Sequence, residues 1–484
     1  MANLRFRWFF YSVIAGRSSQ FRWNQSARFG YRDFVMTANW RLQGVQRPFL
    51  IGSGIKDITP REQLEECLSA IAIREPTVRA FAYIDIEGAR VAADRATERR
   101  LAGRSISPID GMVVGIKDII ETAAMPTGMG SPLYDGWRSG RDAASVAALK
   151  EAGAIILGKT VTTEFAATEP GSTRNPWDSR RTPGGCSSGS AAAVAAGFVN
   201  AALGTQVLGS IMRPASFCGC FGFKPSVGGL NRGGSHDAFS QSCTGVLAAS
   251  LEDLWQVAYE IVIRAGGDPG YPGLSGPPRA PVAKKPSRLI FLETAGWAGA
   301  SPEGKSKFEQ AIADLRQAGI EILTRADHPD IEAVEASIAP SITVSNLIND
   351  WEGRWPLNTY RDRDIDKLSR HMRERLERAE AMSLTDARAA LSQRSEIRRQ
   401  YTKLAALCDA CITLSASGPA PLGLESTGSP VFAAPASLLG APAISIPYFT
   451  VESLPLGFQL VAAVGADANL FANAAALCEL IANS

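Results

Sequence analysis

Hydrophobic and polar positions follow two different periods along most of this chain. Short uninterrupted apolar runs are typical of buried strands, and the stretches between them repeat their apolar residues every three or four positions, as helices do. The strand-like runs are residues 80–84, 112–116, 154–157, 320–323, 411–414 and 441–446. Alternation of this kind predicts a layered α/β fold built around a sheet. The last two runs indicate that the end of the chain rejoins that sheet.

Capping residues and breakers mark where the helices begin and end. A capping box at Thr59–Glu62, with proline at the first helical position, predicts a helix start, and a second start is predicted at Ser301–Pro302. Residues 142–152 are predicted to form a helix between two strands. Residues 266–286 are rich in glycine and proline and must form a loop. Residues 360–407 combine high charge with helical spacing, which predicts solvated helices.

Composition narrows the class of protein and of partner. The chain has 484 residues, 45% of them hydrophobic and 20% charged, as in soluble globular proteins. A net charge of +2 provides no concentrated basic face for nucleic acid, so a small-molecule partner is expected. Residues 190–212 carry no charge, but their Gly, Ser, Thr, Gln and Asn content predicts a buried segment, and no membrane partner is expected.

The cysteines point to a reducing compartment. The eight cysteines are irregularly spaced, and the C-x-x-C at Cys408–Cys411 lacks the second pair that a zinc site needs. Reduced thiols and a cytoplasmic location are therefore expected.

The first 55 residues differ from the rest, because arginine and aromatic residues dominate them and Asp33 is their one acid. Residues 8–15 could be the apolar run of a signal-like start, although no good small-residue cleavage site follows. A disordered tail, or an upstream start used in place of Met36, would explain the segment equally well. We divide the chain into an extension, residues 1–55, and a domain, residues 56–484.

Two kinds of nucleophile are compatible with the residues themselves. Residues 185–189 read GCSSG and fit the G-x-S-x-G pattern of a nucleophile elbow, with Ser187 as nucleophile. Such a serine needs a histidine base further along the chain. His236 follows too soon for an intervening acid strand, and the polar surroundings of His328 and His371 predict surface positions. The elbow is therefore poorly supported.

A lysine base is the other possibility. Lys117 follows an apolar strand, where burial would lower its pKa and allow it to act as a base. A structural lysine paired with Asp118 would explain the same residues. Downstream, Ser210 follows a glycine-containing turn whose successive N–H groups could cradle an oxyanion.

Several long motifs, taken in order, resemble the amidase signature family of serine hydrolases, and the resemblance covers roughly Lys56 to Ser484. The motifs are GIKD, GGCSSGSAAAVAAG, GTQVLGSIMRPASFCGCFGFKP, TGVLAASLEDL, LLGAPAISIP and LPLGFQLV. The resemblance implies an α/β fold with α/β/α layers around a large mixed twisted sheet. It also implies an acyl-serine mechanism that uses no metal and no organic cofactor. Similar enzymes often pair as homodimers.

The resemblance assigns the catalytic roles residue by residue. It makes Ser210 the nucleophile and Lys117 the base, and it places Cys186 where the family usually has a bridging serine. The backbone N–H groups implied to form the oxyanion hole are those of Val207, Leu208, Gly209 and Ser210. In the implied relay, neutral Lys117 takes a proton from the bridge, which takes one from Ser210 as it attacks the carbonyl carbon.

The sequence departs from the family pattern at the bridge. A thiol is a weak donor whose ordinary pKa, about 8.5, lies below that of lysine, about 10.4, so Cys186 and Lys117 could settle as a charged pair. Three outcomes are open: Cys186 relays protons, Ser187 takes over as a substitute bridge, or activity is impaired.

Two further departures lie beside the nucleophile. Leu208 stands where glycine is usual, which predicts a reshaped acyl pocket. Gln206 replaces the common aspartate, and Arg213 comes one place later than in many members. Gln206 and Arg213 together indicate that a different set of side chains supports the segment beneath Ser210. The acyl pocket is expected to draw on residues 130–134 and on the helical region after Ile342.

The leading prediction is an amidohydrolase that cleaves a carboxylic amide, or an ester, through an acyl-serine intermediate. One alternative is an amidotransferase-type subunit that releases ammonia from an amide for a partner enzyme. The other is a non-catalytic scaffold that keeps the fold.

Overall fold

The computed structural model describes residues 58–167, 169–237 and 239–482. The predicted extension, residues 1–55, lies outside the described residues. The chain divides into two units, and the described residues all belong to the second of them, residues 40–484.

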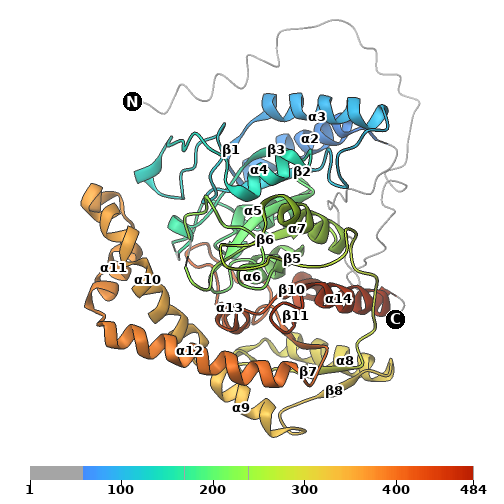
Figure 1. The fold of residues 1–484 in the computed structure, drawn as a ribbon, viewed down its shortest axis with the longest axis vertical. Coiled ribbons are helices and arrows are strands. Elements are labelled where there is room, and N and C mark those ends of the chain that lie inside the picture. Colours follow the sequence, from blue (N-terminus) through green and yellow to red (C-terminus); the bar gives the residue numbers. More distant parts are fainter. Residues whose placement is uncertain (1–57, 168, 238, 483–484) are drawn as a thin grey trace, which may run out of the picture. The chain divides into compact units, whose positions relative to one another are not determined.

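An 11-stranded mixed sheet organises this unit, with strand order β1-β3-β2-β4-β6-β5-β10-β11-β9-β7-β8 (Figure 1). The strands are β1 (Phe81–Ile84), β2 (Val113–Lys117), β3 (Ile155–Thr160), β4 (Ala201–Gln206), β5 (Phe221–Lys224), β6 (Cys243–Ala248), β7 (Arg288–Phe291), β8 (Glu321–Leu323), β9 (Ala410–Leu414), β10 (Ala443–Val451) and β11 (Leu454–Val461). Strands β3, β2 and β4 run parallel, as do β8, β7 and β9, and antiparallel pairs join the two groups.

Helices follow or separate most of these strands. They are α2 (Pro60–Val78), α3 (Ile86–Leu101), α4 (Ala144–Glu151), α5 (Ser188–Ala195), α6 (Met212–Cys218), α7 (Leu251–Ala265), α8 (Pro302–Gln317), α9 (Pro329–Ile338), α10 (Ser341–Asp364), α11 (Arg370–Ala381), α12 (Leu384–Ala405), α13 (Ala434–Leu439) and α14 (Asp467–Ala482). The capping box predicted at Thr59 is present, with its hydroxyl accepting from the Glu62 N–H. Ser301 caps α8 in the same way.

Side chains that alternate along each strand enter two separate hydrophobic layers. Val114 and Leu203 pack into one layer with α4, α7, α8 and α14, whereas Val113 and Ala202 pack into the other with α2, α5, α6, α12 and α13. Successive side chains of a strand point to opposite faces of a sheet, so a sheet covered on both sides needs strands that are apolar throughout. The α/β/α fold expected from the sequence is therefore confirmed.

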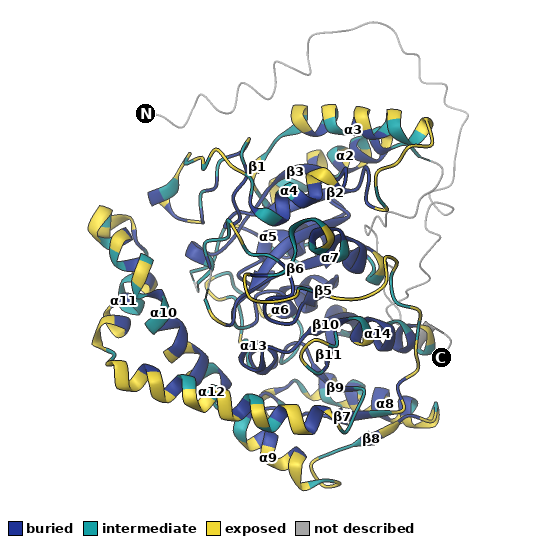
Figure 2. Ribbon diagram, in the orientation of Figure 1, coloured by how far each residue is buried: buried dark blue, intermediate teal, exposed yellow. Residues whose placement is uncertain are grey.

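The predicted strands are all present, and β10 runs beyond the predicted residues 441–446 because it forms a hairpin with β11. Strands β9 and β10 pair with β7 and β5, so the end of the chain does rejoin the earlier sheet. The charged residues 360–407 lie mostly in α10, α11 and α12, whose outer faces are exposed (Figure 2). None of the described helices is long and apolar enough to cross a membrane.

Candidate active site

Three segments far apart in the sequence meet at one edge of the sheet. Lys117 is the last residue of β2, and Ser210 lies in the turn between β4 and α6. Because β2 and β4 are parallel neighbours, their carboxyl ends lie at the same edge. Cys186 precedes α5, which packs against both strands. The structure therefore brings the three predicted catalytic residues together.

Lys117 is completely buried, and its ammonium nitrogen donates to the Thr205 hydroxyl over 2.6 Å. Thr205 lies on β4, the strand that neighbours β2 in the sheet. Burial lowers the pKa of Lys117, and the nearby Cys186 and Asp237 side chains only partly oppose that shift. The environment therefore favours the neutral amine that a general base requires.

The alternative pairing of Lys117 with Asp118 is wrong. Asp118 instead lies 2.9 Å from the ammonium of Lys159, which is on the neighbouring strand β3. Adjacent residues at the end of a strand point to opposite sides, so Asp118 turns away from the preceding lysine. Among the described residues, Lys117 has no carboxylate within ion-pair distance.

Cys186 lies between Ser210 and two backbone carbonyls. The Ser210 hydroxyl donates to the Cys186 sulfur over 3.2 Å, and the sulfur lies 2.8 Å from the carbonyl oxygens of Ala166 and Ala167. The Gly185–Cys186 peptide bond is cis. The thiol hydrogen is thus directed at carbonyl oxygens, and it must turn for a proton to pass on to Lys117.

Ser187 makes different contacts from Cys186, although the two are adjacent. Its hydroxyl donates to the Thr205 carbonyl and accepts from the Thr205 N–H, each over 3.2 Å. The side chain is fully buried, and both hydrogen bonds go to the backbone of β4. These contacts join the start of α5 to the sheet and leave the hydroxyl poorly placed for an elbow nucleophile.

The turn of residues 207–210 presents its backbone N–H groups without partners. None of these four groups donates a hydrogen bond to another described residue. The side-chain oxygen of Gln206 accepts from the N–H groups of Ile211 and Met212, over 2.8 and 3.0 Å. Gln206 therefore caps the start of α6 and holds the turn. This is how the glutamine, in place of the usual aspartate, supports the segment around Ser210.

Two more side chains hold the same turn from outside. Ser437, on α13, accepts from the Gln206 amide over 3.0 Å and donates to the Leu208 carbonyl over 2.8 Å. The Gln241 amide donates to the Val207 carbonyl over 3.0 Å. Sequence reasoning missed both residues, and no local signal could have found them, because each lies in a segment remote from the turn.

Arg213 braces the segment that carries Cys186. Its guanidinium donates to the Gly185 and Gly428 carbonyls, over 2.7 and 2.9 Å, and to the Thr427 hydroxyl over 3.2 Å. Burial lowers the pKa of Arg213 to about 10. No described carboxylate lies within ion-pair distance, so carbonyl and hydroxyl oxygens alone solvate this cation.

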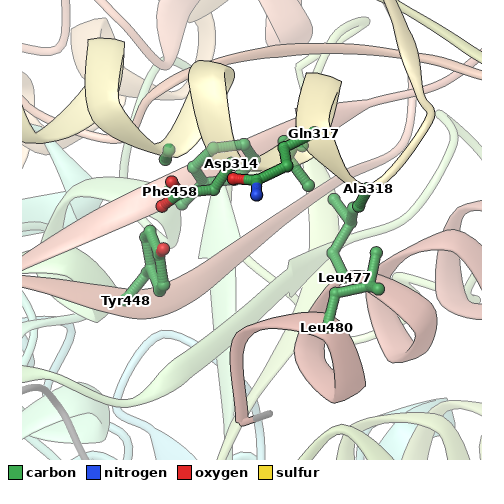
Figure 3. Close-up of a pocket in the computed structure, with 9 residues that line it drawn as sticks. Asp314, Gln317, Ala318, Tyr448, Phe458, Leu477 and Leu480 are labelled. Atoms are coloured by element: carbon green, nitrogen blue, oxygen red, sulfur yellow. The ribbon is translucent and has the colours of Figure 1, made fainter. Parts of the chain in front are cut away.

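The remaining predicted features lie away from this cluster. His328 caps α9, and His371 is more than half exposed and bonded to Glu169, so both are surface residues as expected. His236 packs on Trp137 and bonds to Glu121. A cavity of about 290 Å³ lies between α8, α14 and the β10–β11 hairpin (Figure 3). Its lining holds no serine, cysteine or lysine, so it is separate from the catalytic cluster.

Comparison with known proteins identifies the family of the chain. The Amidase family model matches residues 62–471 of the chain. The chain belongs to the Amidase family.

Relatives of this Amidase-family protein include enzymes and enzyme subunits. It is 34% identical over 472 residues to a glutamyl-tRNA(Gln) amidotransferase subunit from Roseiflexus castenholzii, covering 88% of this chain and 93% of the relative. A crystal structure of an amidase superimposes with a TM-score of 0.75 at 28% identity, covering 87% of this chain and 96% of that one. The peptide amidase from Stenotrophomonas maltophilia gives a TM-score of 0.68 at 25% identity, covering 87% and 93%.

These comparisons confirm the family and the fold expected from the motifs. They support an amide-cleaving enzyme as the general class of this Amidase-family protein.

Proposed function

We propose that this protein cleaves a carboxylic amide through an acyl intermediate on Ser210. The observation that carries the proposal is the hydrogen bond from the Ser210 hydroxyl to Cys186, with the buried, unpaired Lys117 nearby. In the proposed first step the Ser210 oxygen attacks the carbonyl carbon while its proton passes to Cys186. The proton displaced from Cys186 goes to neutral Lys117.

The carbonyl oxygen becomes negative in that step and needs donors. The partnerless N–H groups of residues 207–210 supply them, and the loss of one such donor typically costs about 10² to 10³ in rate. When the C–N bond breaks, the same relay returns a proton to the leaving nitrogen. Water then attacks the acyl-serine, gives its proton to the relay and releases the carboxylic acid, which restores the Ser210 hydroxyl.

The contacts of the two bridging candidates favour Cys186. Its sulfur touches the Ser210 hydroxyl, whereas the Ser187 hydroxyl bonds only to the backbone of Thr205 among the described residues. Relay through Cys186 is therefore preferred to the substitute bridge. The oxygens around Arg213 accommodate the positive charge of its guanidinium without an ion pair, while Lys117 remains free to accept the proton.

The test is intact-protein mass after incubation with a fluorophosphonate. We expect one adduct on the wild type, none on Ser210→Ala, and one on Ser187→Ala, which is the matched control from the same site. A wild type that folds but forms no adduct would support the non-catalytic scaffold instead. An adduct on Ser210→Ala that disappears in Ser187→Ala would restore the elbow.

The second candidate function is the release of ammonia from an amide for a partner enzyme. The names of the curated relatives favour this function over hydrolysis by a free-standing amidase. The curated relative at 34% identity, which covers 88% of this chain, is named as a subunit of glutamyl-tRNA(Gln) amidotransferase. Gln206, in place of the common aspartate, favours a free-standing amidase over a subunit of this kind.

Ammonia release from glutamine separates the two candidates. A free amidase should hydrolyse simple amides alone, with glutamine a poor substrate. An amidotransferase component should co-purify with a partner and release ammonia from glutamine faster when the partner and tRNA are added. Both candidates use Ser210, so the Ser210→Ala variant should lose either activity.

A further inference from the structure

Arg375, on α11, lies close to the catalytic cluster but has no part in the proposed relay. Its guanidinium carbon lies 5.2 Å from the centre of the Phe239 ring. Two residues further along the chain, the Gln241 amide donates to the Val207 carbonyl, in the turn that ends at Ser210. One short segment therefore contacts both this arginine and the turn that carries the proposed oxyanion hole.

The helix that carries Arg375 also packs beside the bridging residue. Met372 and Leu376, on either side of Arg375 in α11, belong to one hydrophobic cluster with Phe165. The two residues after Phe165 are those whose carbonyl oxygens lie 2.8 Å from the Cys186 sulfur. Arg375 and Cys186 are near enough for their charges to interact. Two separate sets of contacts thus place the arginine next to the proposed catalytic cluster.

The guanidinium of Arg375 is fixed on one side and open on the other. Its Nε donates to the Asp350 carboxylate over 3.0 Å, and its Nη2 donates to the Asn349 carbonyl over 2.8 Å. The third nitrogen, Nη1, donates to no described residue and remains accessible to solvent. The side chain as a whole is 13% exposed. Nη1 is therefore a positioned donor that a ligand can reach.

The positive charge of Arg375 is only partly compensated. Its partner Asp350 also accepts from Arg378 over 3.1 Å, so one carboxylate serves two cations. Arg213, the other arginine near the bridge, is bonded only to carbonyl and hydroxyl oxygens among the described residues. The arginines beside the bridge therefore carry more positive charge than their carboxylate partner balances. Partial burial strengthens the attraction of such charge for an anion.

Of the two arginines near Cys186, Arg375 is the one that a substrate can reach. Arg213 is buried, its Nε is sealed from solvent, and its other two nitrogens are bonded to the backbone and to Thr427. Arg375 keeps an accessible nitrogen, and α11 lies in the helical region from which the acyl pocket is expected.

We infer that Arg375 recognises a carboxylate on the substrate, so that the preferred substrate is an amide whose acyl part carries a carboxylate group. The inference rests on the proposed function at Ser210. In the complex, Nη1 of Arg375 donates to a carboxylate oxygen while the amide carbon lies against the Ser210 oxygen. Hydrogen bonds between charged groups are stronger than those between neutral groups, so an uncharged amide of equal length should react more slowly.

The experiment compares two pairs of amides in which a carboxylate replaces a methyl group: succinamate with butyramide, and glutaramate with pentanamide. We expect kcat/KM of the wild type to favour the carboxylate in at least one pair by about tenfold or more. Arg375→Met should lower kcat/KM for that carboxylate about 30-fold more than for its uncharged partner. Asp350 keeps Arg378 as its partner in this variant, so no carboxylate is left buried alone. Arg375→Lys, which retains the charge, should recover part of the preference.

Arg378→Met is the matched control. Arg378 shares the Asp350 carboxylate with Arg375, but its side chain is 61% exposed, so solvent screens its charge. We expect the preference for the carboxylate to stay within about threefold of the wild type. A loss equal to that of Arg375→Met would indicate a general effect of charge and would overturn direct recognition by Arg375.

Isothermal titration of Ser210→Ala with succinamate and with glutaramate separates this inference from the proposed function. Saturable binding that disappears when Arg375→Met is added to Ser210→Ala would support the inference even if the wild type hydrolysed no amide. Wild type that hydrolyses both members of each pair at equal rates would overturn the inference and leave the proposed function in place. An Arg375→Met variant that loses activity equally on both members would also overturn it, because the arginine would then have only a structural role.

Discussion

Lys117 is the last residue of β2, and Lys159 is the last but one of the neighbouring strand β3; both are completely buried, yet only Lys159 has a carboxylate partner among the described residues. Lys159 lies 2.9 Å from the Asp118 carboxylate and donates to the Thr127 hydroxyl over 2.7 Å. Lys117 has only the Thr205 hydroxyl as a hydrogen-bond partner among the described residues. A paired ammonium is stabilised in its charged form, whereas an unpaired buried one gives up its proton more readily.

The comparison teaches that burial alone does not mark a catalytic lysine. Burial lowers the pKa of both residues, but a carboxylate opposes the shift most strongly for Lys159. We assign the structural role to the paired lysine and the proposed base to the unpaired one.

The largest expected effects follow from replacing each lysine by methionine. Lys117→Met should lower kcat by about 10² to 10⁴, the usual contribution of a general base, with little loss of stability. Lys159→Met should leave the Asp118 charge buried without its partner and lower the free energy of unfolding by about 3 to 5 kcal/mol. Amide turnover and urea unfolding of the two variants measure both effects, and a stable but inactive Lys159→Met would break the comparison.

Replacing Cys186, the proposed bridging residue, should have the next largest effect on turnover. Cys186→Ser should keep turnover within about tenfold of the wild type, and Cys186→Ala should lose about 10² or more, because alanine cannot pass a proton between Ser210 and Lys117. Steady-state rates on one amide substrate decide this. Equal activity of Cys186→Ala and wild type would remove Cys186 from the relay.

The pH dependence of the rate sharpens the contrast between the lysines. Since Lys117 must be neutral to accept a proton, kcat/KM should rise about tenfold per pH unit and level off below its ordinary pKa of 10.5. Over the interval between the lowered pKa and 10.5 the unfolded chain binds more protons than the folded one, so stability also rises with pH. Lys117→Met should lack that part of the stability slope, whereas a slope identical to that of the wild type would contradict the lowered pKa.

The smallest expected effect concerns the acyl pocket. Leu208 is partly exposed in the turn before Ser210, and its carbonyl is held by Ser437. Leu208→Gly should shift the preference towards larger acyl groups by a few-fold, because it removes a branched apolar side chain beside the acyl carbon. A series of amides of increasing chain length measures the shift, and an unchanged preference would disprove this role.

Local sequence determined much of the fold. The capping box at Thr59, the apolar runs that became strands and the loop at residues 266–286 depend on nearby residues alone. Hydrophobic periodicity and capping act over a few residues, so they can be predicted without knowing the partners of each element. The order of the strands in the sheet could not be predicted in this way, because it depends on pairings between distant segments.

The motifs also determined which residues belong to the candidate site: Lys117, Cys186, Ser210 and the turn before Ser210. Only the tertiary structure decided which partners the side chains in and around this site bond to. Asp118 turned to Lys159, Ser187 bonded to β4, and Gln206 and Ser437 joined to support the turn. Charge pairing and hydrogen bonding act between side chains that folding brings together, so a sequence specifies the residues of a site before it reveals their partners.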